Sequence, residues 1–143
     1  MPVSPIPDGY HTVSPYLIAE DAGQLLEFMQ KAFGAKETFR MEMPDGSVGH
    51  AEVRIGDSVV MVGGAGGAWP AVRAAIHLYV PDVDATYQAA LAAGARSTEE
   101  PADQFYGDRR ANVVDAAGNQ WFIATHVEDV PPEELEQRAA ARS

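Results

Sequence analysis

The sequence contains no cysteine, which excludes disulfide bonds, thiolate catalysis and cysteine-ligated metals and fits a reducing compartment. It is also poor in basic residues, with 10 Lys and Arg against 21 Asp and Glu and a formal net charge of −11. Such a chain repels phosphate backbones and anionic membrane surfaces, so we expect neither nucleic acid nor membrane as a partner. No apolar run approaches the roughly 20 residues that span a bilayer, and the opening MPVSPIPDGYHT lacks the regions of a signal peptide. These absences predict a soluble cytoplasmic protein.

The sequence does contain a stretch that occurs twice. Residues 14–35 read SPYLIAEDAGQLLEFMQKAFGA and residues 75–95 read AIHLYVPDVDATYQAALAAGA. Both have a short apolar run, an Asp, an amphipathic segment and then Gly-Ala, and the glycine turn and apolar strand that follow them also match. The offset between the copies stays between 60 residues, at Gly34, and 62 residues, at Gly56. Self-similarity at a fixed offset predicts a duplicated unit whose two copies bury one shared core, and 143 residues fit one compact domain.

Each copy changes from a strand pattern to a helix pattern. Residues 12–19 alternate in polarity as a half-buried strand does. From Asp21 the apolar residues recur at helical spacing, with Asp21 as a possible N-cap and Gly34 as the residue that closes the helix. We expect three further strands in the first copy, at 37–43, 48–55 and 58–62. The second copy repeats this order with a strand at 74–80, a helix at 83–93, strands at 96–100, 111–114 and 120–125, and a loop at 101–110. The predicted fold is α+β, built from two tandem βαβββ modules.

The domain organisation follows from local composition. Residues 1–11 carry three prolines and a glycine, which is typical of an irregular arm on the surface. Residues 12–126 form the single domain, with module one at 12–63, a linker at 63–72 and module two at 73–126. The linker begins GGAGGAWP, and no Lys-Ser/Thr pair or following helix supports a phosphate-binding loop there. Residues 127–143 form an acidic tail with a short helix that begins at two prolines.

Two tandem βαβββ modules with the phrases GHAEVRIGDSVVMV, IHLYVPDVDA, PADQFYGDR and WFIATHVEDVPPEEL resemble the vicinal oxygen chelate superfamily, and within it the PhnB-like branch. This superfamily includes glyoxalases, bleomycin-resistance proteins, fosfomycin-resistance enzymes and extradiol dioxygenases. The resemblance covers roughly residues 12–135. It implies that each module curls its sheet into a half-barrel, with the helix on the convex side and a cavity for metal and ligand on the concave side. It also implies a homodimer.

Metal-binding members of the superfamily take His, Gln or Glu ligands from the first and last strands of each module. Carried onto this sequence, these positions fall on Ser14, Ala75, Phe122 and about Val60. Ala, Phe and Val side chains have no donor atom, and a lone serine is a poor ligand. The resemblance therefore implies that the usual metal site is missing. We expect no cofactor, unless a divalent metal binds at a relocated site.

Alternate residues of a strand point to the same face, so the neighbours of the metal-ligand positions at spacing two are also expected to line the cavity. The residues expected to line it are Ser14, Tyr16, Ile18, Ala75, His77, Tyr79, Gln120 and Phe122. The opposite face is apolar and is expected to pack on the helices through Ile76, Leu78, Val80, Trp121 and Ile123. Aromatic walls with a few polar groups are the usual composition of a small-molecule site.

Two groups of titratable residues are candidates for catalysis or binding. His77 lies two positions beyond a vacated ligand position and can act as a general base or a ligand donor, or simply as a hydrogen-bonded residue of the pocket wall. His50, Glu52 and Arg54 alternate along one strand. There His50 and Glu52 can share a proton or hold a relocated cation, and Arg54 can pair with an acidic ligand. The alternative for this second group is a solvated strand face.

Three further residues are candidates for the rim of the pocket. Trp69 can close over a ligand as a lid or cover the junction between the modules. Tyr106 and Arg110, which neighbour Asp108 and Arg109, can bind an anion or pack at a dimer interface.

The absent metal ligands and the acidic, aromatic framework favour a binder of a small aromatic or cationic molecule, of the sequestering kind found among bleomycin-resistance proteins. The alternative is a lyase, isomerase or dioxygenase-like enzyme that uses a relocated metal, or His77 or His50 as base. A third interpretation is an interaction module with a vestigial pocket.

Overall fold

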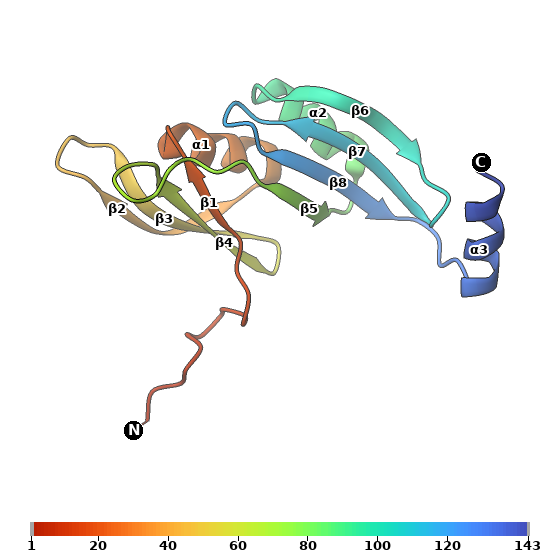
Figure 1. The fold of residues 1–143 in the computed structure, drawn as a ribbon, viewed down its shortest axis with the longest axis horizontal. Helices are drawn as coiled ribbons and strands as arrows, with labels where there is room; N and C mark the ends of the chain where they lie inside the picture. Colours follow the sequence, from red (N-terminus) through yellow and green to blue (C-terminus); the bar gives the residue numbers. More distant parts are fainter. Residues whose placement is uncertain (1, 143) are drawn as a thin grey trace.

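The computed structural model describes residues 2–142, which form eight strands and three helices (Figure 1). The first module comprises β1 (Tyr16–Ala19), α1 (Ala22–Phe33), β2 (Lys36–Glu42), β3 (Val48–Ile55) and β4 (Ser58–Gly64). The second comprises β5 (Ala75–Tyr79), α2 (Val83–Ala92), β6 (Arg96–Asp103), β7 (Asp108–Val114) and β8 (Gln120–His126). The helix α3 (Pro132–Ala140) follows them. The predicted pair of βαβββ modules is confirmed.

The two modules have the same sheet topology. The first sheet has the order β1-β4-β3-β2 and the second has the order β5-β8-β7-β6. In each sheet the first strand of the module pairs in parallel with its last strand, and the remaining neighbours are antiparallel. Both sheets are open. The duplication read from the sequence is therefore a duplication of the complete strand arrangement.

The helices begin and end where the local sequence favours it. The Asp21 carboxylate accepts a hydrogen bond from the backbone N–H of Gln24 at 3.0 Å, which caps the start of α1. Gly34 ends this helix in the left-handed conformation, with φ of 66°. In α2 the Asp82 carboxylate accepts from the N–H of Ala85 at 3.1 Å. These caps fix the point at which each first strand turns into its helix.

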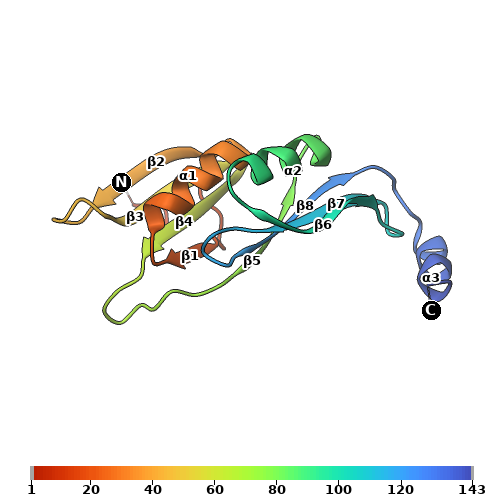
Figure 2. The ribbon, with the colours of Figure 1, turned by 90° about the horizontal axis from the view of Figure 1, so that it is seen from above.

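One core joins the two modules, as the repeat predicts. Helices α1 and α2 pack against each other on the same side of the two sheets (Figure 2). Trp121 of β8 is fully buried, and its ring lies 4.7 Å from that of Phe33 and 6.3 Å from that of Phe28, both in α1. The side of each sheet that faces away from the helices is left open, and this side carries most of the predicted site residues.

The structure corrects three predicted boundaries. The strand predicted from residue 12 begins at Tyr16 instead, and Val13, which precedes it, is 82% exposed. Gly63 and Gly64 belong to β4, so the connection between the modules covers residues 65–74. The predicted loop at 101–110 is largely paired, because β6 and β7 continue into it. In its tight turn, the N–H of Gln104 donates to the carbonyl of Asp108 at 2.7 Å.

The tail docks on this β6–β7 turn. The backbone N–H groups of Val127 and Glu128 donate to the carbonyl of Gly107 at 2.9 and 3.0 Å. Arg138 of α3 donates to the carbonyl of Phe105 at 3.1 Å and pairs with Glu128 at 2.9 Å. These contacts fix α3 at one end of the second sheet (Figure 1). None of the helices described within residues 2–142 has the length and apolar character needed to cross a membrane.

Candidate functional site

The open face of the first sheet carries a chain of hydrogen bonds between predicted site residues. The Nδ1 of His50 and the hydroxyl of Tyr16 are 3.0 Å apart, and the Nε2 of His50 lies 3.0 Å from Oε2 of Glu52. The second oxygen of Glu52 accepts a hydrogen bond from the hydroxyl of Tyr10 in the N-terminal arm. His50 and Glu52 are mostly buried, with 20% and 16% of their side chains exposed. The imidazole is therefore held between a phenol and a carboxylate.

Tyr10 controls the charge of this cluster. Its hydrogen bond, followed in size by that of His50, holds the pKa of Glu52 below its usual range, and the same contact raises the pKa of Tyr10. Glu52 therefore stays ionised to lower pH than an ordinary glutamate. A carboxyl group with a lowered pKa adds stability above its unfolded pKa and loses it as the pH falls through the folded pKa.

We expect Tyr10→Phe to raise the pKa of Glu52 toward its usual value, because the phenyl ring keeps the shape of the arm but cannot donate to the carboxylate. The stability that Glu52 adds above its unfolded pKa should then shrink, so the variant should be less stable at neutral pH and should lose less stability than the original protein as the pH falls. Titration of the Glu52 carboxyl carbon by NMR measures the change. Tyr16→Phe is the matched control, since Tyr16 contacts His50 and not Glu52. An unchanged Glu52 pKa in Tyr10→Phe would contradict this role.

Arg54 holds the arm in place. Its guanidinium donates to the carbonyl of Gly9 at 3.1 Å. A side chain at Gly9 would meet the same guanidinium at 2.7 Å, and the φ of Gly9 is +83°, so glycine suits this position. In this structure Arg54 contacts its own chain, and its contact with an acidic ligand stays a prediction. Under the arm lies a hollow of about 420 Å³, to whose walls Ser14, Glu52 and Met61 contribute.

A second hollow on this face, of about 410 Å³, is lined by Tyr16, Ile18, Gly49, Gly63, Gly64 and Trp69. The Tyr16 ring lies directly on the strand at Gly63, where an added Cβ would be 2.9 Å from it. Trp69 is 68% exposed and reaches this hollow from the connection between the modules. Tyr16 and Trp69 thus line the same hollow, and the role of Trp69 as a lid or as a cover of the junction stays a prediction.

The open face of the second sheet is a row of rings. The His77 ring is parallel to that of Phe122 within 9°, with centroids 6.5 Å apart, and lies 4.8 Å from the ring of Tyr79. The guanidinium of Arg110 lies over Phe122, 5.5 Å from its centroid, and pairs with Glu99 at 3.3 Å. Four predicted site residues therefore meet here, with His77 held among rings.

Sequence reasoning missed a polar cluster at the end of this row. Asp108 is buried, accepts a hydrogen bond from the Tyr79 hydroxyl at 2.9 Å, and lies 2.8 Å from Nδ1 of His126. The other ring nitrogen of His126 lies 2.7 Å from Asp129. The hydrogen bond to Asp129, followed by that to Asp108, raises the pKa of His126. His126 stands at a strand end and offers no periodic signal, so only the folded chain brings it to these partners.

Two predicted residues lie apart from these clusters. Tyr106 is in the β6–β7 turn, where its ring contacts Phe105 at 5.3 Å. Gln120 is at the opposite end of β8, in a hollow of about 660 Å³ that also involves Arg73 and Arg96. The structure does not bring Tyr106 and Gln120 together.

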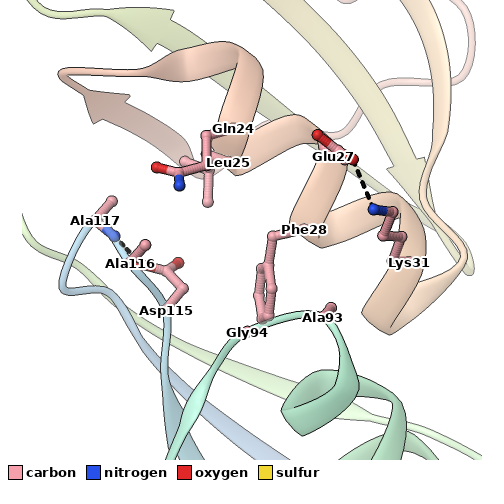
Figure 3. Close-up of a pocket in the computed structure, with 10 residues that line it drawn as sticks. All are labelled: Gln24, Leu25, Glu27, Phe28, Lys31, Ala93, Gly94, Asp115, Ala116 and Ala117. Carbon is pink, nitrogen blue, oxygen red and sulfur yellow. Dashed lines mark hydrogen bonds and ion pairs between the residues drawn. The ribbon is translucent and has the colours of Figure 1, made fainter.

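A further cavity, of about 240 Å³, lies on the helix side at the junction of the modules (Figure 3). Leu25 and Phe28 of α1 form one wall and the turn after β7 forms the other, with the Glu27–Lys31 ion pair at the edge. None of the ten residues that line it is a predicted site residue. It marks the seam between the two copies. Each of the hollows described above belongs to a single module. None combines the open faces of both sheets, because the modules meet through their helices.

A sequence model of the Glyoxalase/Bleomycin resistance protein/Dioxygenase superfamily matches residues 10–123. The chain belongs to this superfamily. Among curated relatives, uncharacterized protein Mb0911c of Mycobacterium bovis is 37% identical over 138 residues, which cover 87% of this chain and 89% of the relative. Uncharacterized protein Rv0887c of Mycobacterium tuberculosis is also 37% identical over 138 residues and is covered to 79%.

Solved structures share the glyoxalase/bleomycin resistance fold. The crystal structure of TioX from Micromonospora sp. ML1 is similar with a TM-score of 0.70 and 24% identity, over 82% of this chain and 99% of that one. A glyoxalase/bleomycin resistance protein/dioxygenase from Nocardioides is similar with a TM-score of 0.63 and 20% identity, over 85% and 87% of the two chains. At these identities the likeness concerns the fold.

The metal positions of the glyoxalase superfamily do not fit a metal in this member. Ala75 of β5 is the strand partner of Gln120, and Phe122 of β8 is the strand partner of His77. The side chains of Ala75 and Phe122 offer no donor atom to a metal. The position predicted at about Val60 is corrected to Met61. In the second module Phe122 is the strand partner of His77, and in the first module Met61 is the strand partner of the equivalent residue, Tyr16. Val60 is instead buried in the core. A thioether is a soft ligand and does not replace a carboxylate.

The residues considered for a relocated metal site lie on two different sheets. His50 and Glu52 contact each other, but His77 belongs to the other sheet. Across residues 2–142, no group of three or more His, Asp or Glu side chains is placed to hold an ion.

Proposed function

We propose that this protein is a metal-free, PhnB-like member of the superfamily that binds a small aromatic or cationic organic molecule and sequesters it, as in bleomycin-type resistance. The observation that carries the proposal is the loss of metal-binding side chains at the positions where metal-binding members of the superfamily have them. These positions hold Ser14, Ala75, Met61 and Phe122, while rings occupy the neighbouring positions on both open faces.

The electrostatics of the first module support a cationic ligand. Glu52 is kept ionised by its hydrogen bonds, and it lies at a hollow of about 420 Å³. Tyr16 and Trp69 present ring faces at the adjacent hollow, and the net charge of the chain is −11. Ring faces and negative charge both attract organic cations.

We further propose a cytoplasmic homodimer in which a second copy covers the open faces. Several large apolar side chains on the strands are half-exposed or more in the single chain, among them Phe39, Met41 and Tyr79. Strand β2 is exposed along its whole length. A partner subunit would remove this apolar surface from water and close the hollows into pockets.

The test is a panel of aromatic cations, their neutral isosteres and aromatic anions, screened by thermal shift and calorimetry. We expect aromatic cations to raise the melting temperature and to bind more tightly than their isosteres. Trp69→Ala should weaken binding about tenfold, the upper range of one aromatic contact, without changing the stability of the free protein. Phe105→Ala, in the β6–β7 turn, is the control and should leave affinity unchanged. A panel without binders, or one that prefers anions, would contradict the proposal.

One observation favours a second candidate, an enzyme of the lyase or isomerase type that uses His50 as general base. Glu52 orients the imidazole of His50 through Nε2, as a carboxylate orients a catalytic base, and Nδ1 would act as the base once a substrate displaces the Tyr16 hydroxyl from it. His77, which has ring neighbours on two sides, is the weaker candidate. This alternative requires turnover of a bound compound that His50→Ala abolishes. Unchanged turnover in His50→Ala and His77→Ala would exclude both bases.

A further inference from the structure

The second sheet contains two buried polar atoms without a hydrogen-bond partner among residues 2–142. They are Nε of Arg110 and Oδ1 of Asn112. Asn112 is 94% buried by residue area, since 6% is exposed, and it faces the open side of the sheet from the middle of β7. Buried polar atoms in proteins are nearly always paired. A donor and an acceptor that are both unpaired, two residues apart on one strand face, indicate a site that a ligand completes.

The duplicated modules provide an internal comparison for Asn112. In the first sheet, Glu52 is the cross-strand partner of Met61, and in the second sheet Asn112 is the cross-strand partner of Phe122. Met61 and Phe122 in turn pair with matching positions of the first strands, Tyr16 and His77. Asn112 therefore occupies in the second module the place that Glu52 occupies in the first.

The two equivalent positions differ in their hydrogen-bond donors. Glu52 accepts a hydrogen bond from the aromatic side chain of Tyr10, which the N-terminal arm delivers across the sheet. Asn112 receives no such side chain from the part of the chain that the structure describes. The first module thus shows this position working as an acceptor for an aromatic donor supplied from outside the sheet.

An ion pair lies beside the unpaired atoms. Glu99 is the cross-strand neighbour of Asn112, and its carboxylate lies 3.3 Å from a terminal nitrogen of Arg110. The pair therefore lies across Asn112. Nearly half of the Glu99 side chain is exposed, and exposed ion pairs of this kind are weak. We therefore expect a ligand to displace Glu99 at little energetic expense and so to reach Oδ1 of Asn112 and Nε of Arg110.

We propose that Arg110 and Asn112 bind the amide edge of an aromatic amide or lactam. The ligand carbonyl accepts from Nε–H of Arg110, the ligand N–H donates to Oδ1 of Asn112, and the ligand ring packs on the exposed ring of His77. This inference rests on the proposed function, the binding of a small organic molecule. It adds a ligand class and a second binding position on the open face of the second sheet. It selects neutral ligands with a donor beside an acceptor.

The probe is the lactam isoquinolin-1(2H)-one, titrated by calorimetry and by NMR of the Asn112 side-chain amide. We expect it to bind and to shift the Asn112 signals. Its N-methyl derivative, which lacks the donor, should bind about tenfold more weakly. The acid 1-naphthoate should also bind more weakly, because its carboxylate cannot donate to Oδ1. Equal affinities for the lactam and its N-methyl derivative, or tighter binding of the naphthoate, would overturn the proposal.

Three variants locate the site. Asn112→Leu should lose about tenfold in lactam affinity and still fold, because it removes an unpaired acceptor. Asn112→Asp keeps an acceptor and should retain lactam binding, and Arg110→Lys keeps the charge but lacks Nε and should lose it. Lactam binding that is unaffected in Asn112→Leu would refute this site. If the lactam binds and aromatic cations do not, the ligand class proposed for the first module is wrong and this inference stands. If aromatic cations bind and the lactam does not, this inference alone is refuted.

Discussion

Replacing Trp121 with alanine should lower the free energy of unfolding by about 3–5 kcal/mol. The indole is fully buried, contacts Phe28 and Phe33 of the other module, and donates its N–H to Asp115 at 2.8 Å. The substitution leaves a cavity at the junction and removes one donor from a buried carboxylate. Because domains are stable by only about 5–15 kcal/mol, this is a large share of the total.

Chemical denaturation of the two tryptophan variants measures this effect. Trp69→Ala is the matched control, because the same side chain at position 69 is 68% exposed. We expect a change within about 0.5 kcal/mol for the control. Similar losses in Trp121→Ala and Trp69→Ala would show that Trp121 does not hold the modules together.

Asp115→Ala should have an effect of similar size, about 3–5 kcal/mol, through hydrogen bonds rather than packing. The buried carboxylate of Asp115 accepts from the backbone N–H groups of Ala117 and Asn119 at 2.9 and 3.0 Å. It also accepts from the side-chain amide of Asn119 at 3.1 Å and from the indole of Trp121. Alanine leaves these donors without an acceptor, and each buried unpaired donor costs about 1–3 kcal/mol.

The two substitutions should not be additive. Since Trp121 donates to Asp115, each single variant already breaks their shared hydrogen bond. The double variant should therefore lose about 1–2 kcal/mol less than the sum of the single losses. Asp57→Ala, at an exposed turn, is the control and should add to Trp121→Ala without interaction. Additive losses for the Asp115 and Trp121 pair would mean that the hydrogen bond contributes little.

The fold could be predicted because its signals are local and occur twice. Asp21 and Asp82 cap helices by contacts only three residues away, which a sequence displays directly. The alternation that assigned Trp121 and Ile123 to the helix side is also local, and both residues are buried. The boundaries at 12–16 and 101–110 failed because pairing, rather than composition, decides where a strand begins and ends.

The site was less predictable because its contacts are distant in sequence. The arm reaches Glu52 from Tyr10, 42 positions away, and no periodicity connects an irregular arm to a strand. His126 acquires its partners only when β7 and the tail are in place. Asn112 could have been found, since it lies within the repeat offset of Glu52, but its significance depends on the absence of a partner in residues 2–142.

The position of β8 determines when the protein can finish folding during its synthesis. This strand lies in the middle of the second sheet and is the last strand of the two modules to be synthesised, yet it carries the indole against which α1 packs. At about 5–20 residues per second, translation reaches Trp121 several seconds after Phe33. Throughout that interval the nascent first half exposes Phe28 and Phe33 to water, and it is then that chaperones would shield the chain.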